Sequence, residues 1–439
     1  MKKVVKFGGS SLANADQFKK VGAIITADDT RRYVVPSAPG KRFPKDTKVT
    51  DMLYACYESA ANGEDFSEQL DNIHARYQEI IDGLNLDFSL DLDFVQIKEN
   101  FSNKAGADYA ASRGECLNGK IMAAYLGFEF VDAAEVVRFN DDGSFNDEVT
   151  NTLLSERLQD CKTAVIPGFY GAKKDGTIVT FSRGGSDITG SLVALAVQAD
   201  LYENWTDVSG FLIADPRIVK NPKSIETITY KELRELSYMG ASVLHEDAIF
   251  PVRKAGIPIN VRNTKAPQDK GALSGEGTCR QPKYTITGIA GTDGFVAITV
   301  EKAMMNSEVG FCRKVLQVFE DNGVSIEHMP SGIDTMSIFV NKDVFEEKEQ
   351  KILADIHKAV NPDHIELESN LALIAVVGRG MKSTRGTAGR IFSALAHAHI
   401  NVKMIDQGSS ELNIIIGVRH DDFKNAIRAL YEIFVLTQI

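Results

Sequence analysis

The sequence predicts an α/β protein: a three-layer sandwich with a mostly parallel central sheet, followed by two smaller α+β units of the ferredoxin-like kind. Two observations lead to this expectation. In the first two-thirds of the 439 residues, short apolar runs alternate with helix-like stretches, and such alternation favours a parallel sheet covered by helices on both faces. After about residue 281 this pattern ends, and a segment occurs that is present twice.

The expected strands of the first part are short apolar runs with helical patterns between them, for example at 17–27 and 192–199. The runs lie at 4–7, 33–35, 128–131, 164–166, 178–181, 211–214 and 257–261. In such a fold, ligands bind at the carboxyl ends of the strands. Residues 62–100 are acidic and less regular, and we expect a helical insertion there.

The second part contains an internal repeat. Residues 324–332 align with 400–408, an offset of 400 − 324 = 76 residues, and the same offset relates 336–339 to 412–415. Each copy reads as strand, helix, strand, strand and helix, and the period is too long for a solenoid. We therefore expect domains at 1–281, 282–366 and 367–439, and the last two can exchange strands.

Composition and charge narrow the functional class. The hydrophobic fraction of 44% and the charged fraction of 25% are ordinary for a globular protein. A net charge of −11 leaves no basic surplus for nucleic acid. The five cysteines contain no C-x-x-C pair, so we expect neither a disulfide framework nor a zinc site. No apolar run reaches 18 residues and no signal core opens the chain, so we expect a cytoplasmic protein without a membrane partner.

The first strand ends in a turn that suits an anion. Gly8 and Gly9 follow the apolar run 4–7 and allow close approach of the backbone to a ligand, while Lys6 adds a positive charge. The turn lacks the Walker A pattern. Taken alone, it favours an ordinary first strand followed by a glycine turn.

Two further elements follow apolar runs. Residues 181–187 contain Arg183, two glycines, Ser186 and Asp187 at a strand-to-helix junction, where backbone amides at the helix start stabilise an anion. The guanidinium of Arg183 fits a carboxylate or a phosphate. A tight strand-to-helix turn with a surface arginine is the alternative. The third element comprises residues 205–210 and 215–217.

Together and in this order, these elements resemble the amino-acid kinase family and, within it, the aspartate kinases. The resemblance covers about residues 1–265. It is carried by K-F-G-G-S-S at 6–11, S-A-P-G at 37–40, T-D-M-L at 50–53, S-R-G-E at 112–115, R-G-G-S-D at 183–187, T-D at 206–207 and D-P-R at 215–217. The C-terminal repeat resembles the paired ACT domains of aspartate kinases. Because no G-x-G-x-x-G domain follows, we expect a monofunctional enzyme.

The resemblance implies ATP-dependent phosphorylation of the side-chain carboxylate of L-aspartate to 4-phospho-L-aspartate, the first step of the aspartate-derived amino-acid pathway. ATP is the implied co-substrate, with Mg²⁺, and no metal site made by the protein is expected. The acceptor carboxylate ordinarily has a pKa of about 3.9 and is ionised at neutral pH, so no general base is needed. Catalysis then depends on positioning and positive charge.

The resemblance also implies site residues. Lys6 would stabilise the transferring phosphoryl group, and Asp187 would orient Lys6. The implied aspartate-binding residues are Ser37, Thr50, Glu115, Arg183 and Ser186. The implied ATP-binding residues are Lys6, Phe7, Gly8, Gly9, Thr206, Asp207, Leu212, Arg217 and Ser242. Two of these depart from the family pattern: Leu212 replaces a tyrosine, and Ser242 replaces a lysine.

Paired ACT domains imply an amino-acid effector, lysine or threonine or both, bound between the chains of a homodimer or homotetramer. The implied effector-binding residues are Met305, Ser307, Gly310, Phe311 and Glu327. Two alternatives remain open at this point. One is another enzyme of the same fold that phosphorylates glutamate, acetylglutamate or a nucleotide. The other is a non-catalytic amino-acid sensor.

Overall fold

The computed structural model describes the chain except for residues 183, 209, 242–243, 245, 276–283 and 437–439. The described chain divides into two compact units, and each is formed by several segments. The first unit comprises Met1–Phe211, Glu226–Arg234 and Ser242–Arg280, and the second comprises Leu212–Ile225, Glu235–Ala241 and Gln281–Ile439.

The first unit contains the predicted, mostly parallel sheet. Its eight strands run in the order β10-β12-β11-β7-β1-β2-β4-β3, and the β11–β12 pair is antiparallel. The strands are β1 (Lys3–Phe7), β2 (Arg31–Pro36), β3 (Glu129–Phe130), β4 (Ala164–Val165), β7 (Leu201–Thr206), β10 (Thr227–Ile228), β11 (Ile259–Asn263) and β12 (Ala272–Ser274). The first strand along the chain, β1, is central and pairs in parallel with both β2 and β7.

Two of the predicted strands lie outside this sheet. The run at 178–181 forms β6 (Ile178–Thr180), which pairs antiparallel with β5 (Tyr170–Ala172). The run at 211–214 supplies β8 (Phe211–Leu212), which pairs with β9 (Ser224–Ile225). All three residues of β6 are only partly buried, so this strand does not have the fully enclosed environment of a central parallel strand.

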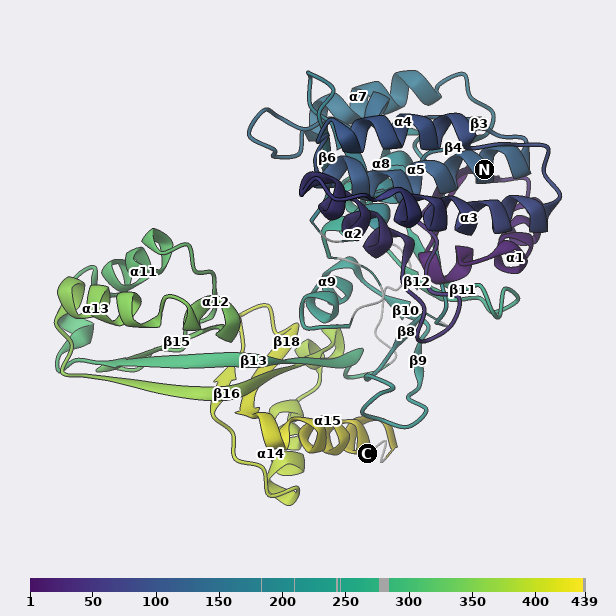
Figure 1. The fold of residues 1–439 in the computed structure, drawn as a ribbon. Coiled ribbons are helices and arrows are strands. Elements are labelled where there is room, and N and C mark those ends of the chain that lie inside the picture. Colours follow the sequence, from purple (N-terminus) through teal and green to yellow (C-terminus); the bar gives the residue numbers. More distant parts are fainter. Residues whose placement is uncertain (183, 209, 242–243, 245, 276–283, 437–439) are drawn as a thin grey trace. The chain divides into compact units, whose positions relative to one another are not determined.

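Helices complete the first unit, and the predicted helical insertion is confirmed. The helices are α1 (Ala15–Thr26), α2 (Val49–Ala61), α3 (Ser67–Leu84), α4 (Asp91–Ser102), α5 (Ala107–Leu126), α6 (Ala133–Val136), α7 (Asp147–Leu158), α8 (Gly185–Ala196) and α10 (Ile249–Ala255). The insertion forms α3 and α4, which lie beside α2 and α5 (Figure 1). In α3, Ile73, Tyr77 and Ile80 recur at helical spacing and are buried, so one face of the helix joins the core.

The second unit is built on a six-stranded antiparallel sheet in the order β14-β15-β13-β16-β18-β17. Its long central strands, β13 (Gly288–Glu301) and β16 (His364–Val377), run side by side (Figure 1). The others are β14 (Ile326–His328), β15 (Thr335–Asn341), β17 (Met404–Asp406) and β18 (Asn413–Arg419). The helices are α11 (Phe311–Asp321), α12 (Lys342–Glu346), α13 (Glu349–Val360), α14 (Thr387–His397) and α15 (Phe423–Tyr431).

Both copies of the repeat use the two long strands. The second half of β13 pairs with β15, and the second half of β16 pairs with β18. This antiparallel arrangement confirms the predicted α+β class of the C-terminal part. The predicted division at 366/367 stays a prediction, and it falls within β16. None of the helices in the described part of the chain has both the length and the apolar character that a bilayer crossing requires.

Candidate functional site

The centre of the first unit's site is a buried lysine paired with an aspartate, and an asparagine bonds the same aspartate. Lys6 Nζ lies 2.6 Å from Asp187 Oδ1, and the side chains are 11% and 13% exposed. Asn204 Nδ2 donates to the same oxygen at 2.7 Å. Because β1 and β7 pair Lys6 with Asn204, both side chains project from the same face of the sheet, toward α8. The three residues therefore fix one positive charge beside the carboxyl ends of the central strands.

Local backbone geometry places Asp187 in this cluster. The helix α8 begins after Gly184, whose φ of 60° lies in the left-handed region that glycine adopts readily. The Asp187 amide donates to the Gly184 carbonyl at 2.9 Å, so the carboxylate lies in the first helical turn. Ser186 lies in the same turn, and a Cβ added to Gly168 would approach its side chain to 2.7 Å. Arg183, which was predicted to bind the substrate, lies outside the described residues.

The turns after β1 and β2 contact each other through backbone. The Gly40 amide donates to the Gly9 carbonyl at 2.8 Å, and a Cβ added to Gly9 would lie 2.6 Å from the Ala38 carbonyl oxygen. Glycine is therefore required at position 9 by close approach. The Gly8 amide donates to the Trp205 carbonyl at 3.1 Å, so a phosphate oxygen would compete with that carbonyl. Phe7 is buried, and its carbonyl accepts from the Ser37 amide at 3.0 Å.

Glu115 of α5 is a buried carboxylate with one open oxygen. Its residue exposure is 6%, and its Oε1 accepts from the Ala38 amide at 3.0 Å. Its Oε2 has no hydrogen-bond partner among the described residues. Burial raises the pKa of Glu115 to about 8, while the Ala38 amide and the positive charge of Lys6 act in the opposite direction. A cation placed at Oε2 would satisfy this oxygen and favour the ionised form.

The other predicted aspartate-binding residues converge on Glu115. Asn118, one helical turn further along α5, donates from Nδ2 to the Ser37 carbonyl at 2.6 Å. A Cβ added to Gly114 would lie 3.6 Å from Thr50 Oγ1 and 2.9 Å from the Ala38 Cβ. The structure therefore brings Ser37, Thr50 and Glu115 together from three different elements.

The predicted nucleotide-binding residues are divided between the units. Thr206 ends β7, its carbonyl accepts from the Thr264 amide at 2.9 Å, and its hydroxyl donates to Asp207 Oδ1 at 3.3 Å. Leu212 and Arg217 belong to the second unit. There the Arg217 side chain, 79% exposed, pairs with Asp215 at 2.6 Å. Ser242 lies outside the described residues.

The predicted effector residues occupy one end of the second unit. Met305 and Phe311 are buried, and Ser307 ends the short 3-10 helix Met305–Ser307. Gly310 precedes α11 with a φ of 83°. Glu327, on the edge strand β14, accepts a hydrogen bond from the hydroxyl of Tyr238. Tyr238 is the last residue of α9 (Tyr230–Tyr238) and belongs to the same unit.

Three residues of these sites were missed by the sequence analysis. Asn204 is a buried amide next to the buried Glu203 in β7, and two adjacent polar residues between Tyr202 and Trp205 are a usable signal. Asn118 follows Glu115 by three residues, a spacing that places two side chains on the same face of a helix. Tyr238 contacts Glu327 across 89 residues of sequence, and no local pattern indicates such a contact.

Comparison with known proteins identifies the family. A model of the amino acid kinase family matches residues 1–263, and an ACT domain model matches residues 374–434. Aspartokinase 3 of Bacillus subtilis is 41% identical over 450 residues, which is 98% of this chain and 98% of that protein. The chloroplastic aspartokinase 1 of Arabidopsis thaliana is 27% identical, over 98% of this chain and 80% of that protein.

Solved structures agree with these matches. The aspartate kinase of Clostridium acetobutylicum has a TM-score of 0.92 at 54% identity, covering 98% of this chain and all of that one. Escherichia coli aspartokinase III in complex with aspartate and ADP has a TM-score of 0.81 at 25% identity, covering 99% of each chain. The same enzyme with lysine and aspartate has a TM-score of 0.73 at 26% identity, again covering 99% of each chain. The chain therefore belongs to the amino acid kinase family and, within it, to the aspartate kinases.

Proposed function

We propose that the first unit transfers the γ-phosphoryl group of ATP to the side-chain carboxylate of L-aspartate, giving 4-phospho-L-aspartate and ADP. The observation that carries this proposal is a single buried cluster with two complementary charges. Lys6 is a fixed cation for the phosphoryl group, and Glu115 has an open carboxylate oxygen for the ammonium of a free amino acid. The complex of the E. coli relative with aspartate and ADP supports the same pair of substrates.

The chemical step needs no base from the protein. One oxygen of the aspartate side chain attacks the γ-phosphorus, and the bond from that phosphorus to the bridging oxygen of ADP breaks. The main obstacle is repulsion between an anionic nucleophile and a polyanion, which a fixed positive charge reduces. Asp187 already accepts from Lys6 and Asn204 through Oδ1, so we assign it to orient Lys6.

The proposed substrate contacts follow from the geometry around Glu115. Its Oε2 would accept from the substrate ammonium, while Ser37 and Thr50 would donate hydroxyl hydrogen bonds from the two neighbouring segments. For Arg183, we infer from the family resemblance a contact with the α-carboxylate. Ser186, in the first turn of α8, would add a hydroxyl near the same end of that helix.

The proposed nucleotide contacts lie along β1 and β7. Amides of Gly8 and Gly9 would approach the phosphates, and Thr206 and Asp207 would contact the nucleoside part at the end of β7. Family resemblance alone supports the nucleotide contacts that we propose for Phe7, Leu212, Arg217 and Ser242. Since Leu212 and Ser242 depart from the family pattern, we expect contacts to the base and phosphates that differ from those of typical members.

Mg²⁺ is proposed to enter with ATP. Among the described residues, no group of three or more His, Cys, Asp or Glu side chains is placed to hold a metal ion. A cation that is coordinated mainly by the phosphate oxygens of ATP and by water, as Mg²⁺ usually is, does not need such a group. When bound, the ion would neutralise phosphate charge. The exposed carboxylate of Asp207 at the end of β7 is the protein oxygen that we propose to contact it.

We further propose that lysine, threonine or both bind the second unit and lower activity. Glu327 would accept from the effector ammonium, in place of the Tyr238 hydroxyl, near Met305, Ser307, Gly310 and Phe311. The complex of the E. coli relative with lysine supports an amino-acid effector.

We propose that the chain forms a homodimer or homotetramer in which the second unit makes the interface, and the surface of this unit supports such an assembly. The edge strand β14 has one unpaired side, and Val309 and Ile333 nearby in sequence are 96% and 70% exposed. Free thiols at Cys56, Cys116, Cys161 and Cys312 suit a reducing compartment, and we place the enzyme in the cytoplasm.

Trapping of the acyl phosphate with hydroxylamine tests the activity. With Mg-ATP, the full chain should give hydroxamate from L-aspartate far faster than from L-glutamate or N-acetyl-L-glutamate. UMP has no carboxylate and gives no hydroxamate, so its turnover is followed by the release of ADP and should also be far slower. N-acetyl-L-aspartate is a matched control because it keeps the acceptor carboxylate and lacks the ammonium, so it should be a poor substrate. Equal or better turnover of any of these compounds would contradict the proposal.

A further inference from the structure

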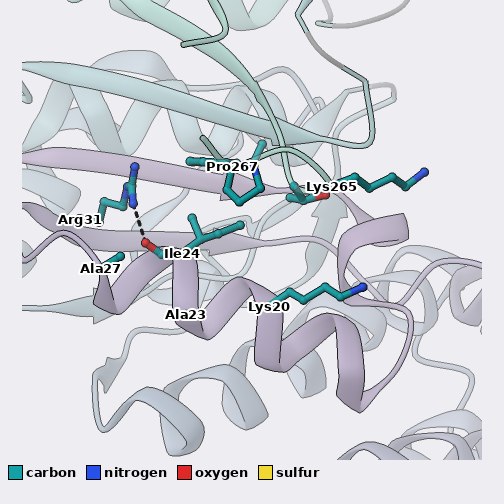
Figure 2. A pocket seen from close by; sticks show the side chains of 9 residues that line it. Lys20, Ala23, Ile24, Ala27, Arg31, Lys265 and Pro267 are labelled. Carbon is teal, nitrogen blue, oxygen red and sulfur yellow. Dashed lines mark hydrogen bonds between the residues drawn. The ribbon is translucent and has the colours of Figure 1, made fainter. Parts of the chain in front are cut away.

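A groove on the first unit lies outside the site described above. It has a volume of about 450 Å³, within the range of small-molecule sites. One wall is a stripe of α1 formed by Lys20, Ala23 and Ile24 at helical spacing, continued by Ala27, which caps the end of the helix. Figure 2 shows the segment with Lys265 and Pro267 on the other wall. Arg31, Trp205 and Thr264 complete the lining.

The groove and the Lys6 cluster lie on opposite faces of the sheet. Successive side chains of a strand point to opposite faces. Asn204 of β7 points to Asp187 on α8, so its neighbour Trp205 points away, toward the groove. The ring of Trp205 stacks on that of Phe7, with centroids 5.9 Å apart, and Phe7 is in turn the neighbour of Lys6. The groove therefore cannot be a part of the aspartate site.

Buried polar contacts hold both walls in place. Arg31 donates from Nη1 to the Ile24 carbonyl of α1 at 2.5 Å and from Nε to Glu203 at 2.8 Å. On the other wall, Arg262 donates from Nη2 to the carbonyls of Pro267 at 2.7 Å and Asp269 at 2.9 Å. Its Nη1 lies 3.4 Å from the same Glu203 carboxylate. Since both walls are connected to one buried carboxylate, the groove is preformed and a ligand pays little to order it.

The lining combines an apolar interior with positive charge. Alanine, isoleucine, tryptophan and proline side chains supply the apolar part. Around Glu203, three cationic side chains meet two carboxylates: Lys3, Arg31 and Arg262 against Glu203 and Asp28.

Two more cations stand at one end of the groove. Lys20 and Lys265 are exposed and extend from the two walls in the same direction, away from Arg31 (Figure 2). Neither side-chain ammonium has a hydrogen-bond or ion-pair partner within the part of the chain that the structure describes. The whole protein has a net charge of −11, but at this end of the groove the charge is positive, and a local positive charge favours the binding of anions.

We propose that the groove binds a small amphipathic anion, with its apolar body against Ala23, Ala27 and Pro267 and its carboxylate or phosphate between Lys20 and Lys265. This site lies beyond the proposed function and does not depend on it. An aliphatic body fits the lining because the exposed apolar side chains are those of alanine and proline, whereas the Trp205 ring is fully buried beneath them. The anionic end remains in contact with water, as the exposure of both lysines requires.

The test uses Trp205, which is the single tryptophan of the chain, as the reporter. Its emission is followed while octanoate, octyl phosphate or the neutral comparator octanol is added to the full chain. We expect a saturable change with at least one of the two anions, and about tenfold weaker binding of octanol. The anion that binds more tightly shows whether the natural ligand carries a carboxylate or a phosphate. No saturable change with either anion, or equal binding of octanol, would overturn the proposal.

Variants show whether the signal comes from this groove. The double change Lys20→Glu with Lys265→Glu should weaken anion binding at least tenfold. Lys19→Glu, on the adjacent exposed position of α1 and outside the lining, is the matched control and should leave binding within about twofold. Ala23→Phe fills the groove from an exposed helix position and should abolish the signal without lowering the melting temperature. Retained binding in both the double variant and Ala23→Phe would refute the assignment.

Discussion

The buried carboxylate of Glu115 gives the sharpest prediction. Its pKa is raised to about 8 by burial, so near neutral pH the substrate-free enzyme holds Glu115 mostly protonated. Binding of an ammonium at Oε2 requires the ionised form. The Michaelis constant for aspartate should therefore rise as the pH falls below 8, and the Michaelis constant for ATP should not follow the same curve.

The expected size follows from the pKa. Below pH 8, each pH unit reduces the ionised fraction tenfold, so the aspartate KM should rise nearly tenfold per unit between pH 7.5 and 6. Folding is linked to the same group. Because the folded pKa lies about 3.5 units above the ordinary 4.5, the folded state binds the extra proton between these values. The free energy of unfolding should fall as pH rises from about 4.5 to 8, by at most about 5 kcal/mol.

The assay measures initial rates with both substrates from pH 6 to 8, alongside thermal unfolding. Glu115→Gln keeps the shape of the side chain and removes its titration. This variant should raise the aspartate KM at pH 8 by at least about thirtyfold, since the loss of a buried charge pair costs about 2–5 kcal/mol, and its KM should no longer depend on pH. Glu135→Gln, at an exposed position of α6, is the control and should behave as the unmodified chain. A flat aspartate KM between pH 6 and 8, or an unchanged slope in Glu115→Gln, would refute the reasoning.

Three further changes probe the other parts of the sites. Lys6→Ala should lower kcat about 10²-fold or more in steady-state assays, because it removes the preorganised positive charge. A much smaller effect would exclude the proposed role of Lys6 in stabilising the transferring phosphoryl group. Gly9→Ala places a methyl group 2.6 Å from the Ala38 carbonyl oxygen, so thermal unfolding should show a loss of about 1–3 kcal/mol and the ATP KM should rise. Tyr238→Phe frees Glu327, so half-inhibition by lysine or threonine should need about two- to tenfold less effector, with uninhibited kcat nearly unchanged. Inhibition that requires more effector in this variant would contradict the competition between Tyr238 and the ligand.

The sequence allowed the order of elements and most of the cluster around Lys6 to be predicted, because both follow from local pattern. Glycine turns at the ends of apolar runs marked Gly9 and the start of α8, and these are the places where the structure brings Lys6 and Asp187 together. The pairing of β5 with β6, away from the central sheet, was not predicted. An apolar run as short as 178–181 carries no information about which strand it will pair with.

Long-range contacts account for the remaining omissions. The Tyr238–Glu327 hydrogen bond and the position of Asn204 beside Asp187 join segments that are distant in sequence. The shared use of β13 and β16 by both repeats has the same origin, since a repeat in sequence shows that two units are alike and leaves open how their strands pair. The buried amide of Asn204 could have been recognised as unusual, but its partner could not.

Two neighbouring residues of β7 connect the two proposed sites. Asn204 fixes Asp187 on one face of the sheet, and Trp205 closes the groove on the other, while the Trp205 carbonyl accepts from the Gly8 amide at the turn proposed to hold phosphate. A ligand in the groove would therefore press on a residue whose backbone is bonded to that turn. The Thr264 hydroxyl offers a second connection, since it lies 2.9 Å from Ser11 Oγ and donates to the Thr206 carbonyl at 3.1 Å. Through these contacts, occupancy of the groove by an amphipathic anion should change the Michaelis constant for ATP. It should leave that for aspartate unchanged, because Ser37, Thr50 and Glu115, the residues proposed to bind aspartate, share none of these bonds.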